Sequence, residues 1–285
     1  MQIGFSGNRF VLICGLMSES AATTFAWEPL TPGGVAAFAR ARLSRLLLVQ
    51  FAVAALAAAA VVSFLSDDCF PIVRAAIHHL PDTGQVRAGR LEWPVQAPEL
   101  LADGRFLAFI VDPDHSGKIN SAAEVQIEFG TETIRVSSLL GYRDFYYLPD
   151  QPFNRIGLEP LWGAWQPELL AITVLATVAV LLLSWAALAT VYFLPVWLIG
   201  FFLNRDLSFP GSWKLAGAAL MPGALLVAVA IVLYDYAIID LVQFCFSFAA
   251  HIVLDWIYLF LSQFFLPRIN STGPKGNPFD QSHIR

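Results

Sequence analysis

The residues whose types and spacing could carry chemistry lie in one apolar stretch, residues 237–266. This stretch contains no Lys, Arg, Gly or Pro, and it exceeds the ~20 apolar residues that a helix needs to cross a bilayer. At about 100° per residue, its polar side chains share one helical face about 120° wide. We call these residues the polar stripe: Asp240, Gln243, Ser247, His251, Asp255 and Ser262. His251 and Asp255 are four residues apart, a spacing that allows a hydrogen bond, a proton relay or cation binding.

Such a stripe on a spanning helix should face other helices or a water-filled cavity, because lipid solvates polar groups poorly. One hypothesis is that His251 and Asp255 make polar contacts that fix the packing of the helices. The other is that the pair moves protons or a cation. The remaining apolar segments offer only hydroxyl and amide groups, and the sequence has no internal repeat of the kind found in transporters. We therefore prefer the packing hypothesis.

The segment 112–120 resembles the front half of a calcium-binding loop. Asp112, Asp114 and Ser116 supply oxygen atoms at the first three ligand positions, and a glycine follows. The last ligand is out of register, because position 12 is Ala123 rather than a glutamate. Asp, Pro, Ser and Gly also form ordinary β-turns. The pattern favours a plain turn, with a calcium site as the alternative.

The sequence contains no assembled catalytic set. Motifs such as HExxH and GxSxG are absent. His78 and His79 are adjacent and would point about 100° apart on a helix, which does not suit one metal ion. The three cysteines, Cys14, Cys69 and Cys245, lack the spacing of a zinc site or a disulfide framework. We therefore expect no enzyme activity, no catalytic residue, no metal and no cofactor.

Composition places the chain in the membrane. Hydrophobic residues make up 57% of the chain and charged residues only 14%, against about 25% charged in soluble proteins. Residues 67–168 hold 8 basic and 15 acidic side chains. This acidic segment argues against nucleic acid or anionic lipid as its partner, because phosphate groups would repel it.

The apolar runs divide the chain into spans and one polar insertion. We expect transmembrane helices at residues 46–65, 169–203, 213–234 and 237–266, the second broken or bent near Pro195 and the third bent at Pro222. The region 67–168 lies between the first two helices. Its short alternating runs and turn residues predict strands, with one alternating run over residues 85–93 and a hairpin that joins Val125–Phe129 to Thr133–Ser137. The predicted fold is an α-helical polytopic membrane protein with four spans and an inserted small, mostly antiparallel β extracytoplasmic domain.

Charge asymmetry gives the expected orientation. Arg40, Arg42 and Arg45 precede the first span, and Asp67 and Asp68 follow it. Because basic residues stay on the cytoplasmic side, the N-terminus is expected in the cytoplasm. Four spans then return the C-terminus to the same side.

The two ends of the chain carry the remaining expectations. Residues 1–45 form a cytoplasmic N-terminal segment in which Met17 is the preferred start, with a cleaved signal peptide as the alternative. Residues 267–285 form a polar cytoplasmic tail.

Short motifs give the chain a family resemblance over roughly residues 45–267. The matching residues are Leu80-Pro81-Asp82, Gly89-Arg90-Leu91 and Val111-Asp112 in the polar region, and Trp213-Lys214 with Pro222 in the third span. The first three resemble a bacterial family of uncharacterised membrane proteins, some named for maltodextrin utilisation. The third span is similar to that of Yip1-type proteins. The resemblance implies a bacterial inner membrane location and supplies no activity.

Three hypotheses about function follow. The preferred one is a non-enzymatic accessory or scaffold protein beside a transport system, with the lipid bilayer and other membrane proteins or a second copy as partners. The second is a small ion- or solute-coupled carrier that uses the polar stripe. The third is an extracytoplasmic sensor for a ligand or calcium.

Overall fold

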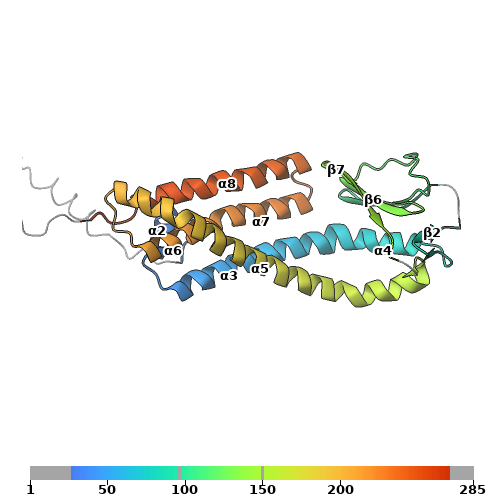
Figure 1. Cartoon of the computed structure of the whole chain (residues 1–285), viewed down its shortest axis with the longest axis horizontal. Helices are drawn as coiled ribbons and strands as arrows, with labels where there is room; N and C mark the ends of the chain where they lie inside the picture. Colours follow the sequence, from blue (N-terminus) through green and yellow to red (C-terminus); the bar gives the residue numbers. More distant parts are fainter. Residues whose placement is uncertain (1–26, 95–97, 149–150, 270–285) are drawn as a thin grey trace, which may run out of the picture. The chain divides into compact units, whose positions relative to one another are not determined.

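The computed structural model describes residues 27–94, 98–148 and 151–269 (Figure 1). It is mostly helical, with a small, mostly antiparallel β region inserted between residues 85 and 152, which confirms the predicted fold class. In the described part of the chain, four helical segments are long and apolar enough to cross a membrane: Leu43–His79, Arg155–Phe202, Phe209–Asp235 and Leu241–Phe264. The chain is therefore a multi-pass membrane protein. The expectations for Met17, for Cys14 and for the tail beyond residue 269 lie outside the described residues.

Residue contacts divide the chain into two compact units. Unit 1 contains the chain up to Phe51, Leu183–Gly223 and the chain from Ile252 onward. Unit 2 contains Ala52–Leu182 and Ala224–His251. Several of the long helices contribute to both units.

Unit 1 begins with a short helix, α2 (Pro32–Phe38), which the sequence starts in a defined way. Thr31 accepts a hydrogen bond from the Gly34 backbone N–H at 3.0 Å, and Pro32 occupies the first turn. Helix α2 packs beside α6 (Phe209–Ala219) (Figure 1). Ser208 caps α6 in the same manner, at 3.2 Å from the Gly211 N–H. Polar caps thus satisfy the backbone at both helix starts.

The third span is interrupted in its middle. Helix α6 ends at Ala219, Leu220 lies between the helices, and α7 runs over Met221–Asp235. Pro222 accounts for the break, because it has no N–H to donate and clashes with the preceding turn. The sequence predicted one bent helix here. The segment is also the most enclosed of the four, since 67% of its apolar window is buried.

The first two spans are longer than their apolar runs. Helix α3 (Leu43–Phe64) continues through a π-helical turn, η1 (Leu65–Cys69), into α4 (Phe70–His79). The wider turn precedes Pro71, which cannot donate to the carbonyl four residues earlier. Helix α5 covers Arg155–Phe202 without a break at Pro195. At about 1.5 Å per residue it is roughly twice as long as a ~30 Å hydrocarbon core requires.

The β region in unit 2 consists of two sheets. The small sheet has the order β2-β1-β8, with β1 (Gln85–Arg87), β2 (Arg90–Glu92) and β8 (Gln151–Pro152). Ala88 and Gly89 connect β1 to β2 with φ angles of 50° and 74°, which is the two-residue hairpin turn that matches strand twist. The sequence predicted a single alternating strand at this place.

The larger sheet has five strands in the order β3-β4-β5-β6-β7. Their bounds are β3 Glu99–Asp103, β4 Leu107–Val111, β5 Val125–Phe129, β6 Thr133–Ser138 and β7 Gly141–Tyr146. All neighbouring pairs are antiparallel except β4 with β5. Strand β4 is buried along its whole length and forms the centre of the core, together with residues such as Leu101, Tyr147 and Phe153.

Candidate functional site

The first two residues of the polar stripe form a helix cap. Asp240 precedes α8 (Leu241–Phe264), and its Oδ1 accepts a hydrogen bond from the Gln243 N–H at 2.8 Å. Gln243 Oε1 in turn accepts from the Asp240 N–H at 3.1 Å. This reciprocal pair is a capping box, which satisfies two backbone donors at the helix start. Both side chains are exposed, so their role is to begin the helix.

The middle of the polar stripe bonds to its own helix. The Ser247 hydroxyl donates to the Gln243 carbonyl at 3.0 Å. The His251 Nδ1 contacts the Phe248 carbonyl, and the Phe248 ring lies 4.8 Å from the imidazole. Near the other end, the Ser262 hydroxyl is buried and 3.4 Å from the Leu259 carbonyl. These contacts stabilise α8 locally and assemble no relay.

Asp255 differs from the rest of the polar stripe. Its carboxyl group lies close to the backbone N–H of Gly223, in the first turn of α7 at the break in the third span. The first backbone N–H groups of a helix lack acceptors within the helix and favour negative charge. The second oxygen, Oδ1, is buried without a hydrogen-bond partner among the described residues. The Asp255 carboxyl group on α8 therefore lies beside the break that interrupts the third span between α6 and α7.

Two buried glutamines make polar contacts between helices in unit 1. Gln50 on α3 donates from Nε2 to the Gly217 carbonyl at 3.0 Å, and it is 5% exposed. A Cβ added to Gly217 would lie 3.2 Å from that Nε2, so the small residue permits the approach. Gln263 on α8 donates to the Val196 carbonyl on α5 at 3.1 Å and is fully buried. Gln263 also belongs to the apolar stretch 237–266, but the polar stripe does not include it.

A second polar cluster, which the sequence did not predict, lies in unit 2. Arg105, in the turn between β3 and β4, pairs with Asp68 at 3.3 Å and donates to the Tyr234 carbonyl. The Arg105 guanidinium also lies 4.3 Å from the centre of the Tyr234 ring, and the Tyr234 hydroxyl donates to Glu124. Most of these groups form ion pairs or hydrogen bonds with one another. The cluster therefore joins η1, the end of α7 and the β region.

The turn that resembles a calcium loop is closed by its own residues. Asp112 is 2% exposed, and its Oδ2 accepts from the Ser116 hydroxyl at 2.8 Å and the Gly117 N–H at 2.9 Å. His115 lies 2.6 Å from Glu128 on β5. No group of three or more His, Cys, Asp or Glu within residues 27–94, 98–148 and 151–269 is arranged to hold a metal ion. These contacts favour the plain turn.

The two neighbouring histidines have separate partners. His78 lies 3.7 Å from Glu159, and the His79 Nδ1 is 2.9 Å from the Ala75 carbonyl. Cys69 is buried and Cys245 exposed, and both are free thiols.

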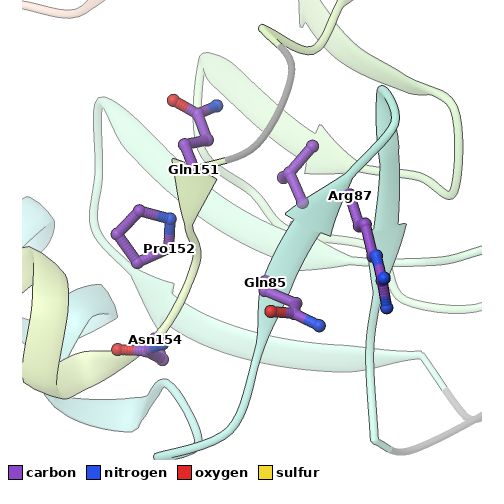
Figure 2. A pocket seen from close by; sticks show the side chains of 6 residues that line it. Gln85, Arg87, Gln151, Pro152 and Asn154 are labelled. Atoms are coloured by element: carbon purple, nitrogen blue, oxygen red, sulfur yellow. The ribbon is translucent and has the colours of Figure 1, made fainter.

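A shallow pocket of about 330 Å³ lies beside the small sheet. Figure 2 shows Gln85 and Arg87 on β1 opposite Gln151, Pro152 and Asn154. Two of its three amide side chains, Gln85 and Asn154, have partners within the fold. Gln85 donates to Glu92 at 2.6 Å and Asn154 donates to the Gly84 carbonyl at 2.9 Å, so these two side chains shape the pocket wall.

Strand β7 is an edge strand of the five-stranded sheet, and no other element covers its side chains within the described residues. All six residues are exposed. It pairs with β6 on one side, and on its other side no strand is present in the described chain (Figure 1). The exposed fractions are 67% for Tyr142, 53% for Phe145 and 84% for Tyr146, and Leu140 in the preceding turn reaches 98%. An edge with free backbone groups and aromatic side chains is suited to pairing with another strand.

The electrostatics of β7 centre on one ion pair. Arg135 on β6 lies opposite Asp144 and contacts it through Nε at 2.8 Å and Nη2 at 3.3 Å. The hydrogen bond from Arg135 holds the pKa of the Asp144 carboxyl below its ordinary value. Arg143 beside it is exposed and has no ion-pair partner within the described residues.

Comparison with known proteins adds no relative: no family model, no curated protein and no solved structure matches the chain.

Proposed function

We propose that the protein is a non-enzymatic accessory subunit of a membrane assembly, anchored by its four helices and docked to a partner through β7. The observation that carries the proposal is the exposure of all six β7 residues on a free sheet edge. A free sheet edge with exposed aromatic side chains is a template for pairing with another strand. The family resemblance remains a prediction, and an accessory role beside a transport system agrees with it.

A photo-crosslinking experiment tests the docking. A photoreactive phenylalanine analogue replaces Tyr146 in the full-length protein in its native membrane, and a matched analogue replaces Ile156, an exposed apolar residue on α5. We expect a discrete protein adduct from the β7 position and none of the same mass from the control. A β7 position that yields no protein adduct contradicts the proposal.

We further propose that the chain ends lie in the cytoplasm of a bacterial inner membrane and that the β region lies outside. Arg40 and Arg42 before α3, Arg45 in its first turn and the aspartates of η1 support this orientation. Single cysteines placed at Gly117 and at Asp206 in a background with Cys14 and Cys245 replaced by serine test it. A membrane-impermeant maleimide should label only the first, and labelling of Asp206→Cys from outside reverses the orientation.

A carrier is the second candidate function, and Asp255 is the observation that favours it. A carboxyl group with an unpartnered buried oxygen, placed against a helix break, matches the way in which transporters build ion sites from discontinuous helices. An ionisable residue inside a span is also a functional candidate by default. His251 contributes less to this candidate than the sequence implied, because its ring nitrogen contacts the Phe248 carbonyl.

Flux measurements in reconstituted vesicles distinguish the carrier from the accessory subunit. Asp255→Asn should abolish cation- or proton-coupled flux, because the neutral amide cannot bind or release a proton. Asp240→Asn is the matched control, since asparagine also caps helices well. A parent protein without flux, or an Asp255→Asn protein with full flux, excludes the carrier.

A further inference from the structure

We propose that a pocket between α4 and α5 binds a phospholipid headgroup that carries both a phosphate and an ammonium group, as in phosphatidylethanolamine. The pocket has a volume of about 200 Å³, and all the residues that line it belong to unit 2. The inference goes beyond the proposed function, because it does not depend on what β7 binds. It rests on the chemistry of the lining side chains and on their order along the two helices.

One face of α5 forms a wall of the pocket. Its lining residues are three or four positions apart, so they share one side of the helix. They are Glu159, Trp162, Gly163 and Gln166. Gly163 is the opening in this wall, because no atom lies within 4 Å of the position that a Cβ would take. The glycine therefore leaves the pocket open, and a long side chain there would occupy it.

Three side chains in the pocket can donate to a phosphate. The Arg74 guanidinium bonds through Nη2 to the Gln166 amide oxygen at 3.0 Å, and it forms no ion pair within the described chain. Its positive charge and its other N–H groups therefore remain for an anion, and the Gln166 amide nitrogen remains a donor. Trp162 packs edge-on against Phe70, and its buried indole N–H has no acceptor among the described residues. An unpaired buried donor is costly, so an acceptor held in this pocket would stabilise it.

An acid in the same pocket matches an ammonium group. The exposed Glu159 carboxylate lies 3.7 Å from the His78 Nδ1, which is longer than a hydrogen bond. Its oxygens therefore remain for an ammonium donor, and they would repel a ligand that is only anionic. A headgroup without net charge also avoids the repulsion that the acidic region 67–168 exerts on anionic lipid.

The order of these groups agrees with the orientation of a lipid in a bilayer. Along α5, Trp162 and Gln166 are closer to the apolar run of this span than Glu159 is. Along α4, Arg74 precedes His78 and is likewise closer to the first span. In a phospholipid the phosphate is attached to the glycerol, and the amine lies farther from the hydrocarbon. The donors therefore lie on the phosphate side and the acid on the amine side.

The depth of the donors also fits a headgroup. Gln166 lies three residues and Trp162 seven residues before Leu169, where the apolar run begins. These separations correspond to roughly 5–10 Å along a helix axis, and the headgroup layer occupies about 5–8 Å on each side of the hydrocarbon core. Tryptophan is also enriched at this level of a membrane. The position of the pocket therefore favours a lipid over a soluble ligand of the same chemistry.

Native mass spectrometry of the full-length, detergent-solubilised protein tests the pocket. The probes are phosphatidylethanolamine, phosphatidylglycerol and soluble phosphoethanolamine, each added over a series of concentrations. We expect the parent protein to bind phosphatidylethanolamine about tenfold more tightly than phosphatidylglycerol, the ratio that one additional charged hydrogen bond gives. Soluble phosphoethanolamine should bind more weakly than the lipid, because it lacks the acyl chains that contact the helices.

Filling the pocket should remove the binding without harming the fold. Gly163→Leu should lower the affinity for phosphatidylethanolamine at least about tenfold, because the leucine side chain would take the place of the headgroup. The variant should melt no lower than the parent, since leucine is a better helix former than glycine. Ala164→Leu is the matched control, because Ala164 is exposed, adjacent and outside the pocket lining. This control should bind both lipids as the parent does.

Two further substitutions separate the phosphate from the ammonium group. Arg74→Gln should weaken both lipids about tenfold, because each carries a phosphate and loses a charged hydrogen bond. Glu159→Gln should weaken phosphatidylethanolamine alone and bring the two affinities together. A purely structural role of Glu159 would change the two affinities by the same factor, so the ratio of affinities identifies its contact with the ammonium group.

The outcomes separate this inference from the proposed function. Preference for phosphatidylethanolamine that is lost in Gly163→Leu and kept in Ala164→Leu supports the headgroup site. Equal binding of the two lipids by the parent, or full affinity in Gly163→Leu, overturns it. Soluble phosphoethanolamine that binds as tightly as the lipid assigns the pocket to a soluble ligand and overturns the lipid. None of these results changes the photoadduct expected from β7, so the accessory function stands or falls on its own experiment.

Discussion

The two edges of the five-stranded sheet are finished in opposite ways. At one edge, β3 contains a bulge between Leu100 and Ala102, places Leu101 in the core at 2% exposed, and packs against α4. At the other edge, β7 keeps a regular register with β6 over six residues and is exposed throughout. Bulges and covering helices are standard ways to prevent a sheet edge from pairing. The fold uses them at β3 and omits them at β7.

This difference indicates that the openness of β7 is a selected property of one edge rather than a general looseness of the sheet. The protection that β7 does have is its central pair of charges, Arg143 and Asp144. Charges on an edge repel strands that lack matching charges. The same two residues therefore disfavour pairing with strands that lack matching charges.

The largest expected difference between the two edges is in the cost of removing a leucine. Leu101→Ala should destabilise the β region by about 2–5 kcal/mol, because it leaves a cavity in a packed core. Leu140→Ala, at 98% exposed, should change stability by no more than about 0.5 kcal/mol. Hydrogen exchange of the β4 amides in the detergent-solubilised protein measures both. Similar effects at the two positions would mean that the β7 side is as well packed as the β3 side.

Two adjacent tyrosines sharpen the comparison at the end of β7. The Tyr147 hydroxyl donates to the Gly130 carbonyl at 2.8 Å, and burial raises the pKa of this phenol. Tyr147→Phe should cost about 1–2 kcal/mol, because it leaves a buried carbonyl without its donor. Tyr146→Phe is the control and should have no measurable effect, since that side chain is 84% exposed. Hydrogen exchange of the β5 and β6 amides measures both effects. Equal losses of stability in the two variants would contradict the expected difference.

The membrane architecture was predictable because each span needs only a long apolar run, and local composition reports that directly. The extent of the helices was not. Residues 155–168 contain Glu, Trp and Pro, so hydropathy assigned them to the polar region, although they form the first turns of α5. The hairpin over β5 and β6 was predicted from its alternating pattern and its turn.

The candidate sites were less accessible to sequence reasoning. Periodicity grouped Asp240 and Gln243 with His251 and Asp255, although an Asp followed three residues later by Gln at a helix start is itself a capping signal. Gln263 required knowledge of which helix packs against α8. The free edge at β7 depends on strand order, which is set by long-range contacts that leave no mark within the strand itself.

The smallest expected effect is the pH dependence of stability that comes from the Arg135–Asp144 ion pair on β7. Within the described residues, β3 has no ion pair. Because Arg135 lowers the pKa of Asp144 in the folded state, the pair stabilises the fold above the unfolded carboxyl pKa of about 3.9. That contribution is lost as the pH falls through the lower folded pKa. We therefore expect no change between about pH 7 and 5 and a small loss of stability below about pH 4.

The effect is small because water screens an exposed pair. Asp144→Asn should reduce the loss below pH 4, and Arg135→Gln should reduce it equally, because either substitution removes the same interaction. Unfolding curves over a pH series measure this effect. Equal acid sensitivity of the parent protein and of Asp144→Asn would show that this ion pair does not cause the loss of stability in acid.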